Sequence, residues 1–93
     1  MPLFVLTCVD KPGGLQARLD AREAHLAYVR ETGQLKLGGP FLDEAGQMAG
    51  SLLIIEAEDL AAAQAFSARD PYQLAGVFQS VDIRAFRATF GSL

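Results

Sequence analysis

The segment Ala68-Arg69-Asp70-Pro71-Tyr72-Gln73-Leu74-Ala75-Gly76-Val77 joins an alanine-rich run to the last apolar stretch of the chain. Proline cannot continue a helix, so the Asp70-Pro71 step ends one helix and starts a short turn. At this junction Asp70 can either cap the new turn or face a pocket. His25 is the only histidine in the sequence. Because one imidazole and one carboxylate can together perform acid–base chemistry at neutral pH, the functional question is whether the fold brings His25 and Asp70 together.

The residues on either side of this segment predict a helix and a strand. Upstream, Glu58-Asp59 supplies an amino-terminal cap for a helix over Leu60 to Arg69, which is rich in alanine. Downstream, Pro71 takes the first position of the short turn and Gly76 closes it. Val77 to Phe86 then alternates in the manner of a last strand.

An earlier helix is predicted over Leu15 to Thr32, and Gly33 ends it. Its apolar residues form one stripe, made of Leu15, Leu19, Leu26 and Val29. Helical spacing places Arg22 inside this stripe and His25 at its edge, so both side chains point toward the surface on which the helix packs. A cation there needs a partner or a wet cavity, because an unpaired buried charge is costly. The alternative is that Arg22 extends its charge to the rim and His25 is a satisfied boundary residue.

Three other stretches are typical of strands. Pro2 to Val9 is apolar on both alternating faces, as in a central strand covered on two sides. Gln34 to Leu42 begins as a strand that Gly38-Gly39-Pro40 interrupts. After a hairpin turn at Asp43 to Gln47, Met48 to Ala57 forms the third strand.

Three residues in these strands are candidates for a site. Gly39 lets the backbone approach a ligand and can form one wall of a cavity, although an ordinary kink also explains it. Ser51 can donate a hydrogen bond into the same cavity if the two strands pair as a hairpin, or it is an ordinary strand serine. Cys8 has no basic neighbour in sequence, so we expect a small buried hydrophobic residue rather than a thiolate nucleophile.

Composition excludes several classes of protein. The net charge of −3 leaves no basic stripe for nucleic acid. No apolar run is long enough to span a bilayer and the amino terminus lacks a signal-peptide pattern, so we expect a cytoplasmic protein without membrane partners. One histidine and one cysteine are too few for a dedicated metal or haem site, so we expect no cofactor. Apolar residues make up 51% of the chain, which favours a homodimer.

The order strand, helix, strand, strand, helix, strand predicts an α+β fold of the split βαβ type over a single domain, residues 1–93. Right-handed crossovers put both helices on one face of a four-stranded antiparallel sheet. The other face stays bare and is the natural place for a second copy, sheet on sheet, giving a dimeric α+β barrel.

Several short motifs occur in a specific order: Arg22-x-x-His25, Gly39-Pro40, Gly50-Ser51, Ala63 to Phe66, Asp70-Pro71-Tyr72 and Ala75-Gly76-Val77. In this order the chain resembles the YCII-related (YciI-like) proteins over nearly its whole length. The resemblance implies a ferredoxin-like βαββαβ fold, a homodimer and a histidine–aspartate pair in a cleft, which maps onto His25 and Asp70. It also makes Pro40 and Tyr72 candidates for substrate contact. The hairpin loop is shorter here than in many relatives.

Two functions follow from these expectations. In the first, the chain is a small enzyme in which His25 and Asp70 transfer a proton on a small anionic or cyclic substrate, in the manner of an isomerase, lyase or dehydrochlorinase. Arg22, Gly39, Pro40, Ser51 and Tyr72 would hold that substrate. In the second, the chain is a non-catalytic ligand-binding or accessory dimer, in which Arg22, His25 and Asp70 form a buried polar network.

Overall fold

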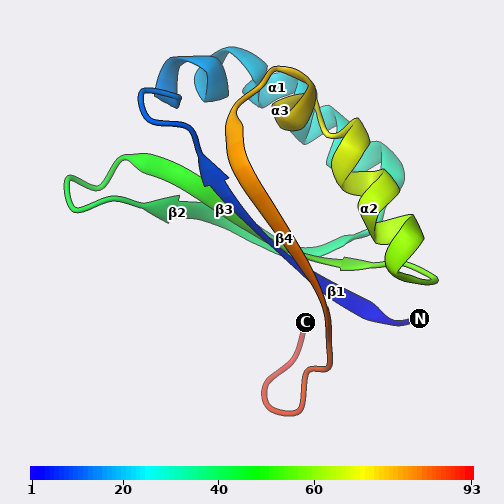
Figure 1. The fold of residues 1–93 in the computed structure, drawn as a ribbon. Helices are drawn as coiled ribbons and strands as arrows, with labels where there is room; N and C mark the ends of the chain where they lie inside the picture. The colour runs from blue at the N-terminus through cyan, green and yellow to red at the C-terminus, as the bar shows by residue number, and fades with distance from the viewer.

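The computed structural model describes residues 1–93 as one antiparallel sheet of four strands with three helices. The elements in chain order are β1 (Leu3–Asp10), α1 (Leu15–Thr32), β2 (Leu35–Leu42), β3 (Met48–Glu56), α2 (Leu60–Arg69), α3 (Pro71–Leu74) and β4 (Phe78–Phe86). The strand order is β2-β3-β1-β4, and all the helices lie on one face of the sheet (Figure 1). The predicted ferredoxin-like βαββαβ arrangement is therefore confirmed, with the turn after Asp70 forming α3. None of the helices combines the length and the hydrophobicity that crossing a bilayer requires.

The boundaries of the helices follow from local capping. The Asp59 carboxylate accepts a hydrogen bond from the Ala62 amide at 2.8 Å and so starts α2. Asp70 does the same for α3 by accepting from the Tyr72 amide at 2.9 Å, with Pro71 in the first turn. Helix α1 ends at Gly33, whose φ of 63° lies in the left-handed region that favours glycine.

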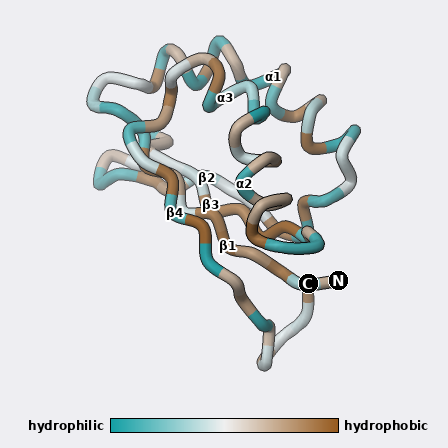
Figure 2. The backbone as a smooth tube through the Cα atoms, turned by 45° about the vertical axis from the view of Figure 1, so that its right-hand side comes forward, coloured by the Kyte–Doolittle hydropathy of each residue, from teal (hydrophilic) through white to brown (hydrophobic).

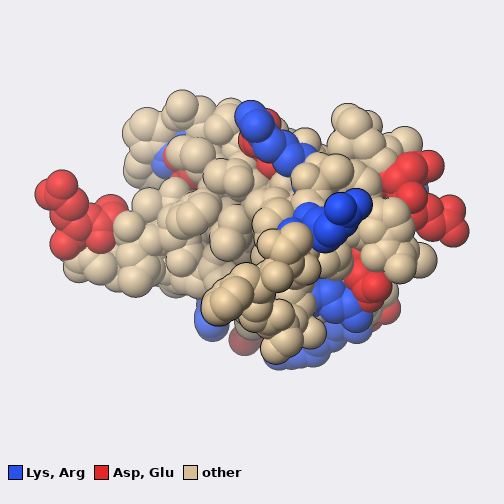
Figure 3. Space-filling view, turned by 90° about the horizontal axis from the view of Figure 1, so that it is seen from below, with Lys and Arg blue, Asp and Glu red and all other residues tan.

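Strand β1 is central in the sheet, between β3 and β4, but only one of its faces is covered within the chain. Phe4, Leu6 and Cys8 point toward the helices and are buried, whereas Val9 on the other face is 44% exposed. The strongest hydrophobic colouring runs along β1 and β3 (Figure 2). Seen from the side opposite the helices, the molecule shows uncharged surface between groups of charged side chains (Figure 3). The prediction that β1 is covered on two sides is wrong for the single chain, because both helices return to the same side of the sheet.

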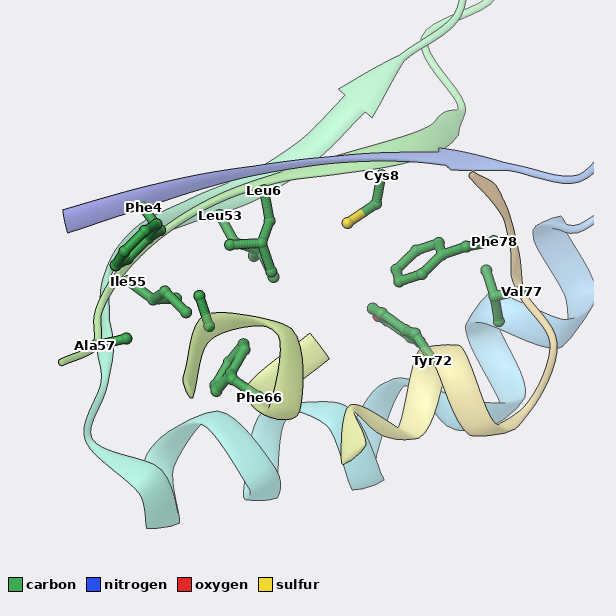
Figure 4. Close-up of a cluster of buried hydrophobic side chains, with 11 residues drawn as sticks. Phe4, Leu6, Cys8, Leu53, Ile55, Ala57, Phe66, Tyr72, Val77 and Phe78 are labelled. Carbon is green, nitrogen blue, oxygen red and sulfur yellow. The ribbon is translucent and has the colours of Figure 1, made fainter. Parts of the chain in front are cut away.

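The hydrophobic core fills the space between the sheet and the helices (Figure 4). Phe66 enters it from α2 and Tyr72 from α3, so the two helical segments that flank Asp70 are both anchored. The sheet supplies most of the remaining members, which are Phe4, Leu6, Cys8, Leu53, Ile55 and Phe78, together with Ala57, Ala63 and Val77. Asp70 is thereby held at a defined place above the sheet.

Strand β2 does not stop at Gly38-Gly39-Pro40, as the sequence predicted, but continues through it. Strand β3 pairs with this segment through Leu53, Leu52 and Ser51, which lie opposite Gly38, Gly39 and Pro40 in that order. The pairing register shifts on either side of the segment, between Leu35 and Leu37 and between Phe41 and Leu42. Proline is tolerated because β2 is an edge strand whose outer side needs no amide donor. The predicted hairpin turn is confirmed, with Asp43 accepting hydrogen bonds from the amides of Ala45 and Gln47.

Helix α1 is rotated relative to the predicted apolar stripe. Leu19 is 46% exposed and Arg22 is exposed, whereas Arg18 and His25 are buried. Leu15, Leu26 and Val29 are only partly buried. Arg18 and His25 are seven positions apart and therefore lie on the same, buried face of α1. The Tyr28 hydroxyl, also on α1, donates a hydrogen bond to the Phe66 carbonyl on α2 at 2.8 Å. Polar partners across the interface set this rotation, because buried Arg18 and His25 each find a carboxylate there.

Candidate active site

His25 and Asp70 meet although they are 45 residues apart in sequence. His25 Nδ1 lies 2.8 Å from Asp70 Oδ1, and the two residues are 6% and 2% exposed. The same Asp70 oxygen accepts the Tyr72 amide that starts α3. One oxygen of Asp70 thus caps α3 and also pairs with the His25 imidazole.

The pairing with Asp70 defines how His25 presents its ring. An ionised carboxylate accepts a hydrogen bond, so Nδ1 carries the proton and Nε2 keeps its lone pair when the imidazole is neutral. Nε2 has no hydrogen-bond partner in the chain, and every fully buried side-chain nitrogen or oxygen has one. Nε2 is therefore accessible. The imidazole is also stacked on the Tyr72 ring, with centroids 4.0 Å apart and planes 13° apart, which limits rotation of the histidine.

His25 lines a partly enclosed cavity of about 220 Å³ between α1, α3 and the β2–β3 hairpin. The five residues that the sequence proposed for substrate contact, Arg22, Gly39, Pro40, Ser51 and Tyr72, all line the same cavity. Asp70 does not line it and lies behind His25. The structure thus brings the candidate residues together around one space, and their roles in binding and catalysis stay predictions.

Arg18 is a cavity residue that the sequence reasoning missed. It is 2% exposed and forms a double hydrogen bond with Asp10, with both N–O distances at 2.8 Å. Its Nη2 also donates to Ser51 Oγ at 2.9 Å, and its Cζ lies 4.6 Å from the Tyr72 ring centroid. The available signal was spacing: Arg18 precedes His25 by seven residues, two helical turns, and so shares its face.

Of the ionisable residues that line the cavity, Arg18 is charged and Tyr72 is neutral at neutral pH. Burial alone would lower the pKa of the Arg18 guanidinium, but hydrogen bonds and charge attraction from Asp10 raise it overall, so Arg18 stays charged. Burial raises the pKa of the Tyr72 hydroxyl, and Arg18 and Arg22 offset this only in part, so Tyr72 is a hydrogen-bond donor at neutral pH. Arg22 forms no ion pair.

Cys8 is a buried thiol rather than a nucleophile. It is 1% exposed and does not line the cavity. Burial raises the pKa of the Cys8 thiol to about 12, and the negative charge of the nearby Asp70 carboxylate acts in the same direction. At neutral pH the thiolate is therefore absent, which agrees with the expectation from sequence.

A larger hollow of about 610 Å³ lies elsewhere, where residues 1–3 meet residues 85–88. Arg87 is the only charged side chain in its wall, which contains no imidazole, carboxylate or thiol side chain. This hollow therefore lacks the groups for acid–base chemistry, and the smaller cavity at His25 is the candidate active site.

Comparison with known proteins places this chain in a family. Residues 2–87 match the YCII-related domain family. Protein YciI of Escherichia coli O6:H1 is 38% identical over 97 residues, which cover 95% of this chain and 99% of that protein. The structure of 5-chloro-2-hydroxyhydroquinone dehydrochlorinase (TftG) from Burkholderia phenoliruptrix AC1100, in complex with 2,5-dihydroxybenzoquinone, is 35% identical. It superposes with a TM-score of 0.83 over 91% of this chain and 93% of that one. An antibiotic biosynthesis monooxygenase of 16% identity shares the fold, with a TM-score of 0.60 over 96% of this chain and 99% of that one. The chain belongs to the YCII-related domain family.

Proposed function

We propose that the chain is a small enzyme in which His25, oriented by Asp70, transfers a proton on a small anionic or cyclic substrate. The observation that carries this proposal is the 2.8 Å contact between Nδ1 and the Asp70 carboxylate at the wall of the cavity. The carboxylate holds the imidazole in one tautomer and stabilises the imidazolium once Nε2 has taken a proton. A general base of this kind accelerates a reaction by roughly 10²–10⁴-fold.

The size and the charge of the cavity support a single substituted ring as the substrate. A cavity of about 150 Å³ is enough for benzene, and this one measures about 220 Å³. Arg22 carries a charge without a carboxylate partner at the cavity, so it suits an anionic group of the substrate. Gly39 and Pro40 supply a backbone wall, and the Ser51 hydroxyl can still donate because Oγ accepts from Arg18.

The likeness to TftG supports dehydrochlorination, or a related elimination, as the reaction class. Loss of HCl from a chlorinated hydroxyhydroquinone requires that one hydroxyl proton moves to the chlorine-bearing carbon. A second hydroxyl proton is then removed while chloride leaves with the electron pair of its bond. The products are the hydroxyquinone and HCl, so no oxidant is needed. One imidazole can accept the first hydroxyl proton, give it to the carbon and then accept the second hydroxyl proton.

The test is chloride release from 5-chloro-2-hydroxyhydroquinone by the unmodified protein and two variants. We expect His25→Ala to abolish turnover, and Asp70→Asn to lower kcat by roughly 10²–10⁴-fold because the amide no longer enforces the tautomer. Asp59→Asn is the matched control, since Asp59 caps α2 as Asp70 caps α3 but does not pair with His25. Turnover that persists undiminished in folded His25→Ala would refute the proposal.

The alternative function is a ligand-binding or accessory protein without catalysis. One observation favours it: every buried side-chain polar atom has a partner without any ligand present. A double-mutant cycle on His25 and Asp70 tests it. Strong coupling in unfolding free energy, with ligand binding but no turnover of any ring substrate, would support this alternative.

We also propose that a second copy covers the bare sheet face. The apolar character of β1 and β3 on that face supports this arrangement. The cytoplasmic location expected from the sequence stays a prediction.

A further inference from the structure

Tyr28 links α1 to α2 one helical turn away from the His25–Asp70 pair. Its hydroxyl donates a hydrogen bond to the Phe66 carbonyl on α2 at 2.8 Å. His25 and Tyr28 are three positions apart on α1, and Phe66 and Asp70 are four positions apart at the end of α2. The two hydrogen bonds therefore join the same two segments at successive turns.

The Phe66 carbonyl is available to Tyr28 because α2 ends at Asp70. In a continuing helix the Asp70 amide would donate to the Phe66 carbonyl, four residues earlier. Here the Asp70 amide donates instead to the Ser67 carbonyl at 3.2 Å. The last carbonyls of a helix need partners from outside the helix, and Tyr28 supplies the partner for Phe66.

The surroundings of Tyr28 suit it to hold these segments together. Its ring packs on the Phe66 ring, with centroids 5.2 Å apart, and Phe66 is anchored in the core. Burial raises the pKa of the Tyr28 hydroxyl, and the nearby Asp70 carboxylate acts in the same direction, so the hydroxyl remains a donor at neutral pH. Helices α1 and α2 contact each other at few other positions, whereas α3 packs directly on α1. Asp70 is thus held relative to α1 by α3 on one side and by Tyr28 on the other.

We propose that Tyr28 is a positioning residue for the His25–Asp70 pair. Its hydrogen bond holds the end of α2 against α1 and so keeps the Asp70 carboxylate where it fixes the tautomer of the imidazole. This inference rests on the proposed function, because it concerns the imidazole that transfers the proton. Tyr28 does not line the cavity, so it acts through Asp70 and His25 rather than on the substrate.

The test is Tyr28→Phe, which removes the hydroxyl and keeps the ring that packs on Phe66. We expect kcat for chloride release from 5-chloro-2-hydroxyhydroquinone to fall roughly tenfold, because a small displacement of a catalytic group lowers the rate steeply. The dissociation constant for 2,5-dihydroxybenzoquinone, measured by titration calorimetry, should change by less than roughly twofold. The reason is that the wall of the cavity is unaltered.

Nitrogen NMR of the imidazole gives a second measurement, which needs no turnover. His25 is the only histidine, so the spectrum reports on this residue alone. At alkaline pH, where the imidazole is neutral, the unmodified protein should carry the proton on Nδ1, because Asp70 accepts it. Tyr28→Phe should show a mixture of the two tautomers, since Asp70 is no longer held from the α2 side.

Thr32→Val is the matched control on α1. It also removes a hydroxyl that donates to a carbonyl, but this bond, to Val29 at 3.3 Å, stays within α1. We expect Thr32→Val to leave both kcat and the tautomer unchanged. Circular dichroism establishes that both variants are folded.

An unchanged tautomer or an undiminished kcat in folded Tyr28→Phe would overturn the inference. Thr32→Val that alters both quantities as much as Tyr28→Phe would also overturn it, because the loss of any hydrogen bond on α1 would then be sufficient. An unmodified protein that is folded and releases no chloride would count against the proposed function instead. In that case the nitrogen spectra of the two variants decide whether Tyr28 positions the pair.

Discussion

At the scale of single residues, one carboxylate oxygen links the local and the long-range structure of this protein. Asp70 Oδ1 accepts both the Tyr72 amide, two residues away, and His25 Nδ1, on another helix. The start of α3 therefore positions the imidazole, and the stacked Tyr72 ring follows from the same turn. The same carboxylate therefore caps a helix and holds the imidazole in place.

Cys8 provides a prediction on pH dependence at this scale. Its pKa is raised to about 12 in the folded chain, whereas an unfolded cysteine titrates near 8.5–9. Above the pKa of the unfolded cysteine, the folded state binds more protons than the unfolded state. The free energy of unfolding therefore decreases as the pH rises from about 9 toward 12. We expect this cysteine to account for about 2 kcal/mol of lost stability by pH 10.5.

The measurement is urea unfolding of the unmodified protein and Cys8→Ala at pH 8 and pH 10.5. Cys8→Ala is less stable at pH 8 because it leaves a cavity beneath β1. That difference should shrink at pH 10.5, since only the unmodified protein carries the thiol. Tyr28 and Tyr72 titrate in both proteins and cancel. A stability difference that is the same at both pH values would contradict the prediction.

At the scale of secondary-structure elements, strand register determines which glycine of β2 shapes the cavity. Gly38 pairs with Leu53, which faces the helices, whereas Gly39 pairs with Leu52, which faces the other way. A Cβ atom at Gly38 would lie 3.0 Å from Leu53 Cδ2 and 3.2 Å from the Leu35 methyl groups. A Cβ atom at Gly39 would meet nothing within 4 Å. Gly39, expected to contact substrate, can therefore do so only through its backbone.

We expect Gly38→Ala to weaken quinone binding by roughly tenfold while the protein stays folded. The added methyl group narrows the cavity, and the side-chain ends that it meets can shift. Gly39→Ala is the control one residue away and should bind the quinone with unchanged affinity. Titration calorimetry on both variants checks this expectation. Equal effects of the two substitutions would show that register does not control the cavity.

At the scale of the whole molecule, the sheet has one face packed under the helices and one face open. The open face is apolar along β1 and β3, and an exposed ion pair between Arg84 and Asp82 marks the β4 side. Figure 3 shows uncharged surface on this face between groups of charged side chains. Apolar surface of this kind is costly in water, which is the physical reason for proposing a homodimer.

We expect sedimentation equilibrium to give twice the mass of the chain, and Leu52→Glu to give the monomer. Leu52 lies on the open face, where a buried glutamate would lack a partner. Ala61→Glu on the exposed surface of α2 is the control and should leave the mass unchanged. An unmodified protein that stays monomeric across the concentration range would refute the sheet-on-sheet dimer.

Local preferences were enough to predict the element order, the bounds of α2 and the capping role of Asp70. Capping and alternation depend on residues a few positions apart, and these are visible in the sequence. The rotation of α1, the burial of Arg18 and the continuity of β2 depend instead on distant partners, namely Asp10, Ser51 and the β3 register. Helix α1 can turn either its polar face or its apolar face toward the sheet. Which face is buried depends on whether the polar groups find hydrogen-bond partners that offset the cost of their burial, and only the folded chain shows this. For that reason the His25–Asp70 pair could be predicted from two motifs, whereas the guanidinium beside it could not.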